Sequence, residues 1–136
     1  AGLSAVPPIL RVRVAWQTDR LAECARFYGE LLGLVTLGRF DDHAGYDGVF
    51  FGLPGSDVQL ELTSHRAGSP AAPSAGDDLL VLYLEAQEAA TAVARRCAEA
   101  GVDPVAPENP YWDGRAIVVP DPDGRLVVLD WGLGEG

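Results

Sequence analysis

The sequence predicts an α+β fold made of two tandem β-α-β-β-β modules. Residues 109–131 contain two runs of alternating apolar residues around an Asp-Pro-Asp-Gly turn, a pattern typical of a β-hairpin. Residues 49–64 repeat this plan around a Pro-Gly turn. A helical pattern that ends in glycine precedes each hairpin, at Gly33 and at Gly101. The two halves therefore repeat at a spacing of roughly 68 residues, which indicates a duplicated module.

The first module is predicted to span residues 9–64. Residues 9–17 alternate like a strand, and Thr18 or Asp19 is suited to cap a helix that continues to about Leu32. A strand at 34–40, a loop rich in Gly and Asp at 41–48, and the hairpin follow. In the first strand, alternation turns Val12, Val14 and Trp16 toward the helix and leaves Arg11, Arg13 and Ala15 on the other face.

A linker and a second module are predicted for the rest of the chain. Residues 65–77 are rich in Pro, Ala, Gly and Ser without periodicity, as in a linker. The second module, residues 78–132, begins with a strand at 79–84 and a helix at 88–100. A short strand at 102–106 and the hairpin complete it. We expect the two modules to form one compact domain.

Composition narrows the function classes. The chain has 136 residues, a formal net charge of −10 and 48% hydrophobic residues. Nucleic acids and anionic membranes require a basic face, so neither is an expected partner. No apolar run is long enough to span a membrane, and no signal peptide is expected. Cys24 and Cys97 fall on the apolar faces of the two helices, which indicates buried, reduced thiols in a cytoplasmic protein.

Two short motifs carry a resemblance to a known family. Phe27-Tyr28 stands before the Leu-Leu-Gly end of the first helix, and Asp121-Pro122-Asp123-Gly124 precedes the last strand. In this order, within two β-α-β-β-β modules, they resemble the glyoxalase / bleomycin-resistance / extradiol-dioxygenase (vicinal oxygen chelate) superfamily. The resemblance implies curved mixed sheets that form a cup, helices outside it, and a small-molecule site in a protein that is often a homodimer.

Strand alternation predicts which side chains line this cup. In the strand at 58–63, Val58, Leu60 and Leu62 are expected on the helix side, and Gln59, Glu61 and Thr63 in the cup. In the second module the predicted cup residues are Leu79, Val81, Tyr83, Leu126, Val128 and Asp130.

The resemblance also implies where metal ligands would stand, one on the first and one on the last strand of each module. In this chain these positions are about Arg11, Glu61, Leu79 and Val128. Only Glu61 can bind a metal, because Arg is a permanent cation and Leu and Val offer no lone pair. We therefore expect no metal cofactor. Arg11 is expected to neutralise Glu61 in the cup, either as a structural ion pair or as a polar anchor for a ligand.

Aromatic residues supply the other half of the predicted site. Tyr111 and Trp112 lie in a loop flanked by Pro and Gly, where they either form a flat wall for a ligand or cover the hairpin or a dimer interface. Trp16 and Trp131 are expected to pack against helices, and His43 and His65 to be solvated in loops. No catalytic residue is assigned. The predicted ligand-binding residues are Arg11, Arg13, Tyr46, Gln59, Glu61, Tyr83, Asn109, Tyr111 and Trp112.

Three functions are compatible with these residues. The first is a metal-free binding protein of the bleomycin-resistance type, a homodimer that sequesters a planar or amphipathic ligand such as an antibiotic. The acidic surface suits cationic ligands. The second is a metal-dependent enzyme of the same fold, with ligands displaced to positions such as His43 or His65. The third is a cofactor-independent enzyme in which Glu61 acts as a base.

Overall fold

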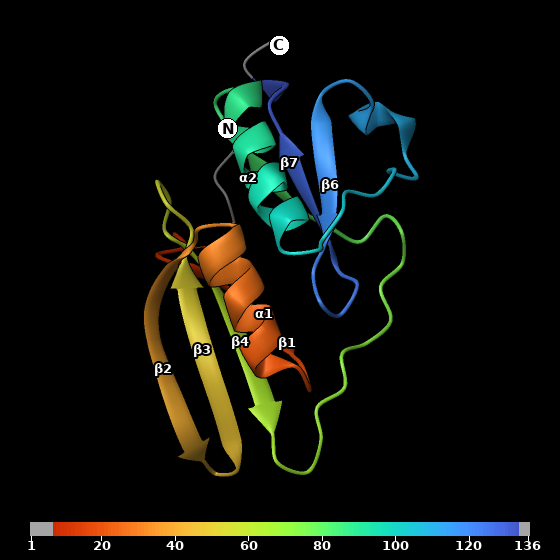
Figure 1. The fold of residues 1–136 in the computed structure, drawn as a ribbon. Helices are drawn as coiled ribbons and strands as arrows, with labels where there is room; N and C mark the ends of the chain where they lie inside the picture. Colours follow the sequence, from red (N-terminus) through yellow and green to blue (C-terminus); the bar gives the residue numbers. More distant parts are fainter. Residues whose placement is uncertain (1–6, 134–136) are drawn as a thin grey trace.

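The computed structural model describes residues 7–133 and contains two mixed sheets (Figure 1). The first sheet has the order β1-β4-β3-β2, and the second has the order β5-β7-β6. In each sheet the first strand of the module runs parallel to the last, and the remaining pairs are antiparallel. The strands are β1 (Val12–Gln17), β2 (Val35–His43), β3 (Tyr46–Gly52), β4 (Val58–His65), β5 (Leu79–Tyr83), β6 (Ala116–Pro120) and β7 (Leu126–Asp130).

One helix accompanies each sheet. The first begins as α1 (Leu21–Arg26) and continues as a π-helical turn, η1 (Phe27–Leu31), and the second is α2 (Gln87–Glu99). A 3-10 turn, η2 (Pro110–Trp112), precedes β6. Figure 1 shows α1 lying across the first sheet and α2 across the second. The predicted α+β class with two successive modules is therefore confirmed. No helix in residues 7–133 is long and apolar enough to cross a membrane.

A single hydrophobic core joins the two modules. The helix-facing side chains of both sheets belong to it, including Leu60 and Leu62 of β4 and Val127 and Leu129 of β7. Burial of Leu60 and Leu62 agrees with the predicted facing of β4. In β7 both faces are buried, but Val127 and Leu129 belong to this core whereas Val128 belongs to a separate cluster. Cys24 and Cys97 lie in the same core as free, fully buried thiols, as expected.

Helix α1 covers β1 less completely than predicted. Trp16 packs against the core, and its ring lies 6.3 Å from that of Tyr28. Val12 and Val14 remain 45% and 37% exposed. The expectation that both valines pack against the helix is wrong, because α1 is a short helix that packs mainly on β4, and neither valine belongs to the core.

The loop expected at residues 41–48 is instead the closed end of a β-hairpin. Strand β2 extends to His43, and β3 begins at Tyr46. Between them, Ala44 and Gly45 have φ angles of 53° and 86°, the left-handed conformations that a tight two-residue turn requires. The Asp and His residues of this segment thus belong to a strand, and His65 ends β4.

Two other local predictions need correction. The helix begins at Leu21 with Arg20 as its N-cap and has no side-chain cap. Thr18 Oγ1 accepts a hydrogen bond from the Arg20 amide, whereas Asp19 accepts one from the distant Ser69 amide. The strand expected at 102–106 is reduced to a single bridge between Val105 and Val118.

Candidate functional site on the open face of the first sheet

The face of the first sheet opposite α1, called here the open face, carries a compact polar cluster. Arg13 donates hydrogen bonds to Gln59 Oε1 from Nη2 at 2.7 Å and from Nε at 3.0 Å. Its Nη1 lies 4.0 Å from Glu61 Oε1. The guanidinium also stands over the Phe50 ring, 5.1 Å from its centroid. The Arg13 guanidinium thus lies over the Phe50 ring, donates to the Gln59 amide oxygen and faces the Glu61 carboxylate.

Strand register explains why these residues meet. Arg13 on β1 is opposite Gln59 on β4, and the next open-face pair is Ala15 with Glu61. On the other side of β4, Glu61 is opposite Phe50 of β3. The Glu61 side chain is 18% exposed, so it is largely desolvated beside its cationic partner.

Arg11 does not have its predicted role. It precedes the first residue of β1 and is exposed. The cation that reaches Glu61 is Arg13, because the parallel register places Arg13 one open-face position away from Glu61. The expected Arg11–Glu61 pair is therefore replaced by an Arg13–Glu61 pair.

Two phenylalanine rings, with planes 36° apart, form an apolar surface beside this cluster, which we call the aromatic floor. Phe40 of β2 lies over Gly48 of β3, and Phe50 of β3 lies over Gly38 of β2. A Cβ at Gly48 would collide with the Phe40 ring, and one at Gly38 would stand 2.9 Å from the Phe50 ring. The aromatic floor was not predicted, although Gly38 and Phe40 in β2 and Gly48 and Phe50 in β3 are each two residues apart.

Three further rings continue along the open face. His43, Tyr46 and His65 are register partners across β2, β3 and β4. The Tyr46 and His65 rings are 4.5 Å apart, and His43 lies 6.4 Å from Phe40. The structure thus places Tyr46 on the same face as Glu61. His43 ends β2 and His65 ends β4, and both had been predicted to lie in loops.

The remaining predicted residues gather at the second sheet. Trp112 is only 8% exposed and packs on the face of this sheet opposite α2. It forms a hydrophobic cluster with Val118 and Val128, against which Leu79, Val81, Ala116 and Leu126 pack. Four of these residues were predicted to line the cup. The indole Nε1 has no hydrogen-bond partner in the part of the chain that is described.

The neighbours of Trp112 are more exposed. Tyr111 is 56% exposed, and Arg115 stands 4.5 Å from its ring centroid. Arg115 Nε donates a 3.0 Å hydrogen bond to Asp130, which raises the pKa of the guanidinium. Tyr83 is exposed beside Asp130, its register partner. The Asn109 side-chain oxygen accepts a hydrogen bond from the Tyr111 amide, and this bond shapes the loop.

The predicted residues therefore form two separate groups. Arg13, Tyr46, Gln59 and Glu61 lie on the open face of the first sheet, and Tyr83, Asn109, Tyr111 and Trp112 surround the second. No hydrogen bond, ion pair or ring contact among residues 7–133 joins one group to the other.

The donor groups present do not fit a divalent cation. Within residues 7–133, no three His, Cys, Asp or Glu side chains lie close enough together to hold a metal ion. Of the four positions that the superfamily uses, Leu79 and Val128 belong to the apolar cluster around Trp112, and the Glu61 carboxylate lies beside a guanidinium. A metal site usually needs three or four lone-pair donors, which these positions do not supply.

Comparison with known proteins identifies the family. Residues 12–63 match the profile of the YycE-like N-terminal domain, and residues 77–130 match that of the YycE-like C-terminal domain. The chain belongs to the YycE-like family. It is 41% identical over 119 residues to YycE of Bacillus subtilis (strain 168), covering 88% of this chain and 86% of that one.

Solved structures support the same fold. The crystal structure of a Bacillus subtilis YycE protein matches this YycE-like chain with a TM-score of 0.85 at 40% identity, over 89% and 88% of the two chains. The trypanothione-dependent glyoxalase I of Leishmania major matches with a TM-score of 0.70 at 21% identity, over 90% and 86%. The antibiotic-binding protein TnmS3 from Streptomyces sp. CB03234 matches with 0.65 at 23%, over 94% and 98%. The vicinal oxygen chelate fold implied by the sequence is confirmed.

Proposed function

We propose that this YycE-like protein binds a planar or amphipathic small molecule on the open face of its first sheet, without a metal ion. The observation that carries the proposal is the Arg13–Gln59–Glu61 cluster beside the aromatic floor. Binding sites of this kind combine a largely apolar surface with a few fixed polar groups. An antibiotic or similar natural product is the proposed ligand class, and the shared fold of TnmS3 supports this choice.

Each part of the site has a defined task. The rings of Phe40 and Phe50 lie against glycine backbone. The Arg13 guanidinium covers the Phe50 ring, so a planar ligand stacks on the Phe40 ring beside it. Arg13 has five N–H donors, of which two serve Gln59. Its remaining donors and the second Glu61 oxygen are the polar anchors for the ligand.

We also propose that the working form is a homodimer in the cytoplasm. The polar cluster of the first sheet and the Trp112 group of the second are not joined within one chain. A second copy placed against the open face would enclose the ligand. The reduced state of Cys24 and Cys97 is consistent with a cytoplasmic location. Native mass spectrometry tests the dimer, and a mass of one chain at micromolar concentration would contradict it.

A ligand screen with matched variants tests the site. Planar natural products are screened by thermal shift, and each compound that binds is then measured by calorimetry. Glu61→Gln is expected to weaken binding about ten- to a hundredfold, because loss of a hydrogen bond to a charged group costs about 1.5–3 kcal/mol. Asp57→Asn removes the same charge from an exposed turn and is the control. Equal affinity of the two variants would show that the ligand does not use the open face.

A further inference from the structure

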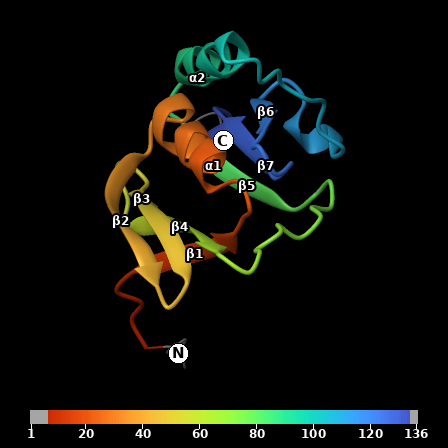
Figure 2. The ribbon, with the colours of Figure 1, turned by 60° about the horizontal axis from the view of Figure 1, so that its bottom comes forward.

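A cavity of about 570 Å³ lies where the two modules meet, between the end of β1 and the start of β5. We call it the junction cavity. None of the nine predicted ligand-binding residues lines it. It adjoins the open face at Ala15 and Gln17, whose register partners are Glu61 and Thr63. The segment that joins β4 to β5, whose course is visible in Figure 2, contributes part of the wall. The lining residues are Ala15, Trp16, Gln17, Ala72, Pro73, Ser74, Asp78, Leu79, Leu80, Arg125 and Leu126.

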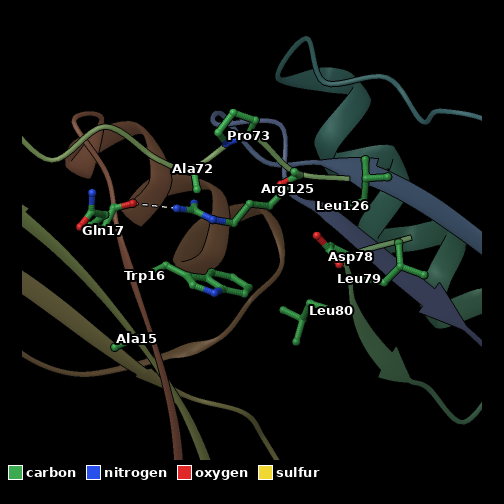
Figure 3. A pocket seen from close by; sticks show the side chains of 11 residues that line it. Ala15, Trp16, Gln17, Ala72, Pro73, Asp78, Leu79, Leu80, Arg125 and Leu126 are labelled. Atoms are coloured by element: carbon green, nitrogen blue, oxygen red, sulfur yellow. Dashed lines mark hydrogen bonds between the residues drawn. The ribbon is translucent and has the colours of Figure 1, made fainter. Parts of the chain in front are cut away.

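Apolar groups from both modules make most of its walls. Figure 3 shows the Trp16 indole from the first module facing Leu79 and Leu80 from the second. Ala72 and Pro73 of the connecting segment lie on the side of Arg125 away from Trp16. The volume falls in the range of roughly 300–1,000 Å³ that small-molecule sites occupy. The cavity thus has the size and walls for a ligand with one or two fused rings.

Arg125 is not available to attract an anion into this cavity. Its Nη1 donates to Asp121 at 3.1 Å and to Asp123 at 3.2 Å, and its Nη2 donates to the Gln17 carbonyl at 2.7 Å. The guanidinium also stacks over Trp16, 4.9 Å from the ring centroid. Two carboxylates therefore more than balance its charge, and its hydrogen-bonding donors are largely engaged.

Asp78 is the carboxylate that remains free. It lines the cavity, is exposed, and forms no ion pair with any residue from 7 to 133. Within the described part of the chain, its one side-chain hydrogen bond is a long one, 3.4 Å, from the Ala75 amide. The charged lining residues are Asp78 and Arg125, and together with Asp121 and Asp123, the ion-pair partners of Arg125, they carry a net charge of −2. The net charge of the whole chain, −10, has the same sign.

We propose that the junction cavity is a second binding site, and that it takes an organic cation consisting of a flat ring system with an ammonium group. The ring lies between Trp16 and the leucines of β5, and the ammonium group pairs with Asp78. Neutral analogues lose the ion pair, and anions are repelled. This site goes beyond the proposed function, because its residues, its charge and its ligand class differ from those of the open face.

Calorimetry with three probes of one shape tests the proposal. The probes are 2-naphthylmethylammonium, 2-naphthylmethanol and 2-naphthoate, which share the ring and differ in charge. The ammonium probe is expected to bind about two- to fivefold more tightly than the alcohol, in keeping with up to about 1 kcal/mol for an exposed ion pair. The naphthoate is expected to bind more weakly than the alcohol.

Two neighbouring carboxylates provide a matched pair of variants. Asp78→Asn is expected to abolish the preference for the ammonium probe. Asp77→Asn removes the same charge from the adjacent exposed residue, which does not line the cavity, and is expected to keep the preference. Ala72→Trp adds an indole to an exposed lining position and is expected to weaken binding of the ammonium and alcohol probes.

The outcomes separate this proposal from the proposed function. Glu61→Gln is expected to leave binding of the ammonium probe unchanged. If Glu61→Gln abolishes that binding, the cation lies on the open face and the junction site is wrong. The proposal would also be overturned if Asp78→Asn and Asp77→Asn had the same effect on the preference for the ammonium probe. Equal affinity for all three probes, or no binding of any probe, would overturn it as well. Thermal unfolding of each variant shows that the change does not come from loss of the fold.

Discussion

The Tyr28 hydroxyl donates a 2.7 Å hydrogen bond to Asp121 Oδ2, which joins the helix of the first module to the β6–β7 turn of the second. Both residues are buried. The Asp121 carboxylate also accepts hydrogen bonds from the amides of Asp123 and Arg125 and from the Arg125 guanidinium, so its charge is well compensated. Burial and the adjacent Asp121 raise the pKa of Tyr28, which keeps its hydroxyl protonated as a donor. The Asp-Pro-Asp-Gly segment is therefore a contact between modules as well as a turn.

Tyr28→Phe should lower the free energy of unfolding by about 1–3 kcal/mol, because a buried carboxylate loses one of its donors. Urea denaturation measures this. Tyr83→Phe is the control, since the Tyr83 side chain is exposed. Removal of its hydroxyl group should change the free energy of unfolding by no more than about 0.5 kcal/mol. Equal effects of the two changes would mean that the Tyr28–Asp121 bond does not stabilise the junction.

Gly48→Ala should destabilise the protein by about 1–3 kcal/mol, because its Cβ would push the Phe40 ring away from the sheet. In a Phe40→Ala background the same change should cost much less, because the obstructing ring is absent. A double-mutant cycle by urea denaturation measures the difference. An unchanged cost in both backgrounds would show that Phe40 does not rest on Gly48.

Stability should fall as the pH rises above about 9. Burial is the main cause that raises the pKa of Cys24 from 9.0 to about 12, so the folded state keeps the thiol proton that the unfolded state loses. The contribution is fully present below pH 9.0 and is lost as the pH approaches 12. One such group changes the free energy of unfolding by about 1.4 kcal/mol per pH unit. Cys24→Ala should flatten the decline over this range, whereas an identical slope in the variant would assign it to other groups.

Elemental analysis of protein purified without chelator and then offered zinc, nickel, iron and manganese should find well below one ion per chain. The reason is that the positions equivalent to metal ligands hold Arg, Glu, Leu and Val. One bound ion per chain would instead favour a metal-dependent enzyme with displaced ligands. His43→Ala and His65→Ala would then be expected to release the ion.

Several features of the site follow from local pattern. Alternation in β4 separates Leu60 and Leu62 from Gln59 and Glu61 because side chains of a strand point to opposite faces in turn. Burial of the two leucines agrees with that assignment. Turn residues located both predicted hairpins, and the glycine after each helix marks its end with a positive φ angle at Gly33 and Gly101.

Other features depend on contacts between distant residues. The partner of Glu61 is Arg13 rather than Arg11 because the register of β1 against β4 depends on where each strand begins, and no local signal marks that point. The extension of β2 and β3 through residues 41–48 requires the tight turn at Ala44 and Gly45, in which a non-glycine residue adopts a positive φ angle.

By itself the sequence determined the α+β class, the duplicated module and the inward or outward facing of most strand residues, because these depend on periodicities of a few residues. Only the tertiary structure decided that Trp112 packs on the second sheet, that Phe40 and Phe50 lie on glycine, and that a cavity opens beside Asp78. These features arise where segments far apart in the chain come together. Their geometry is determined by packing between strands and modules, which no local pattern records.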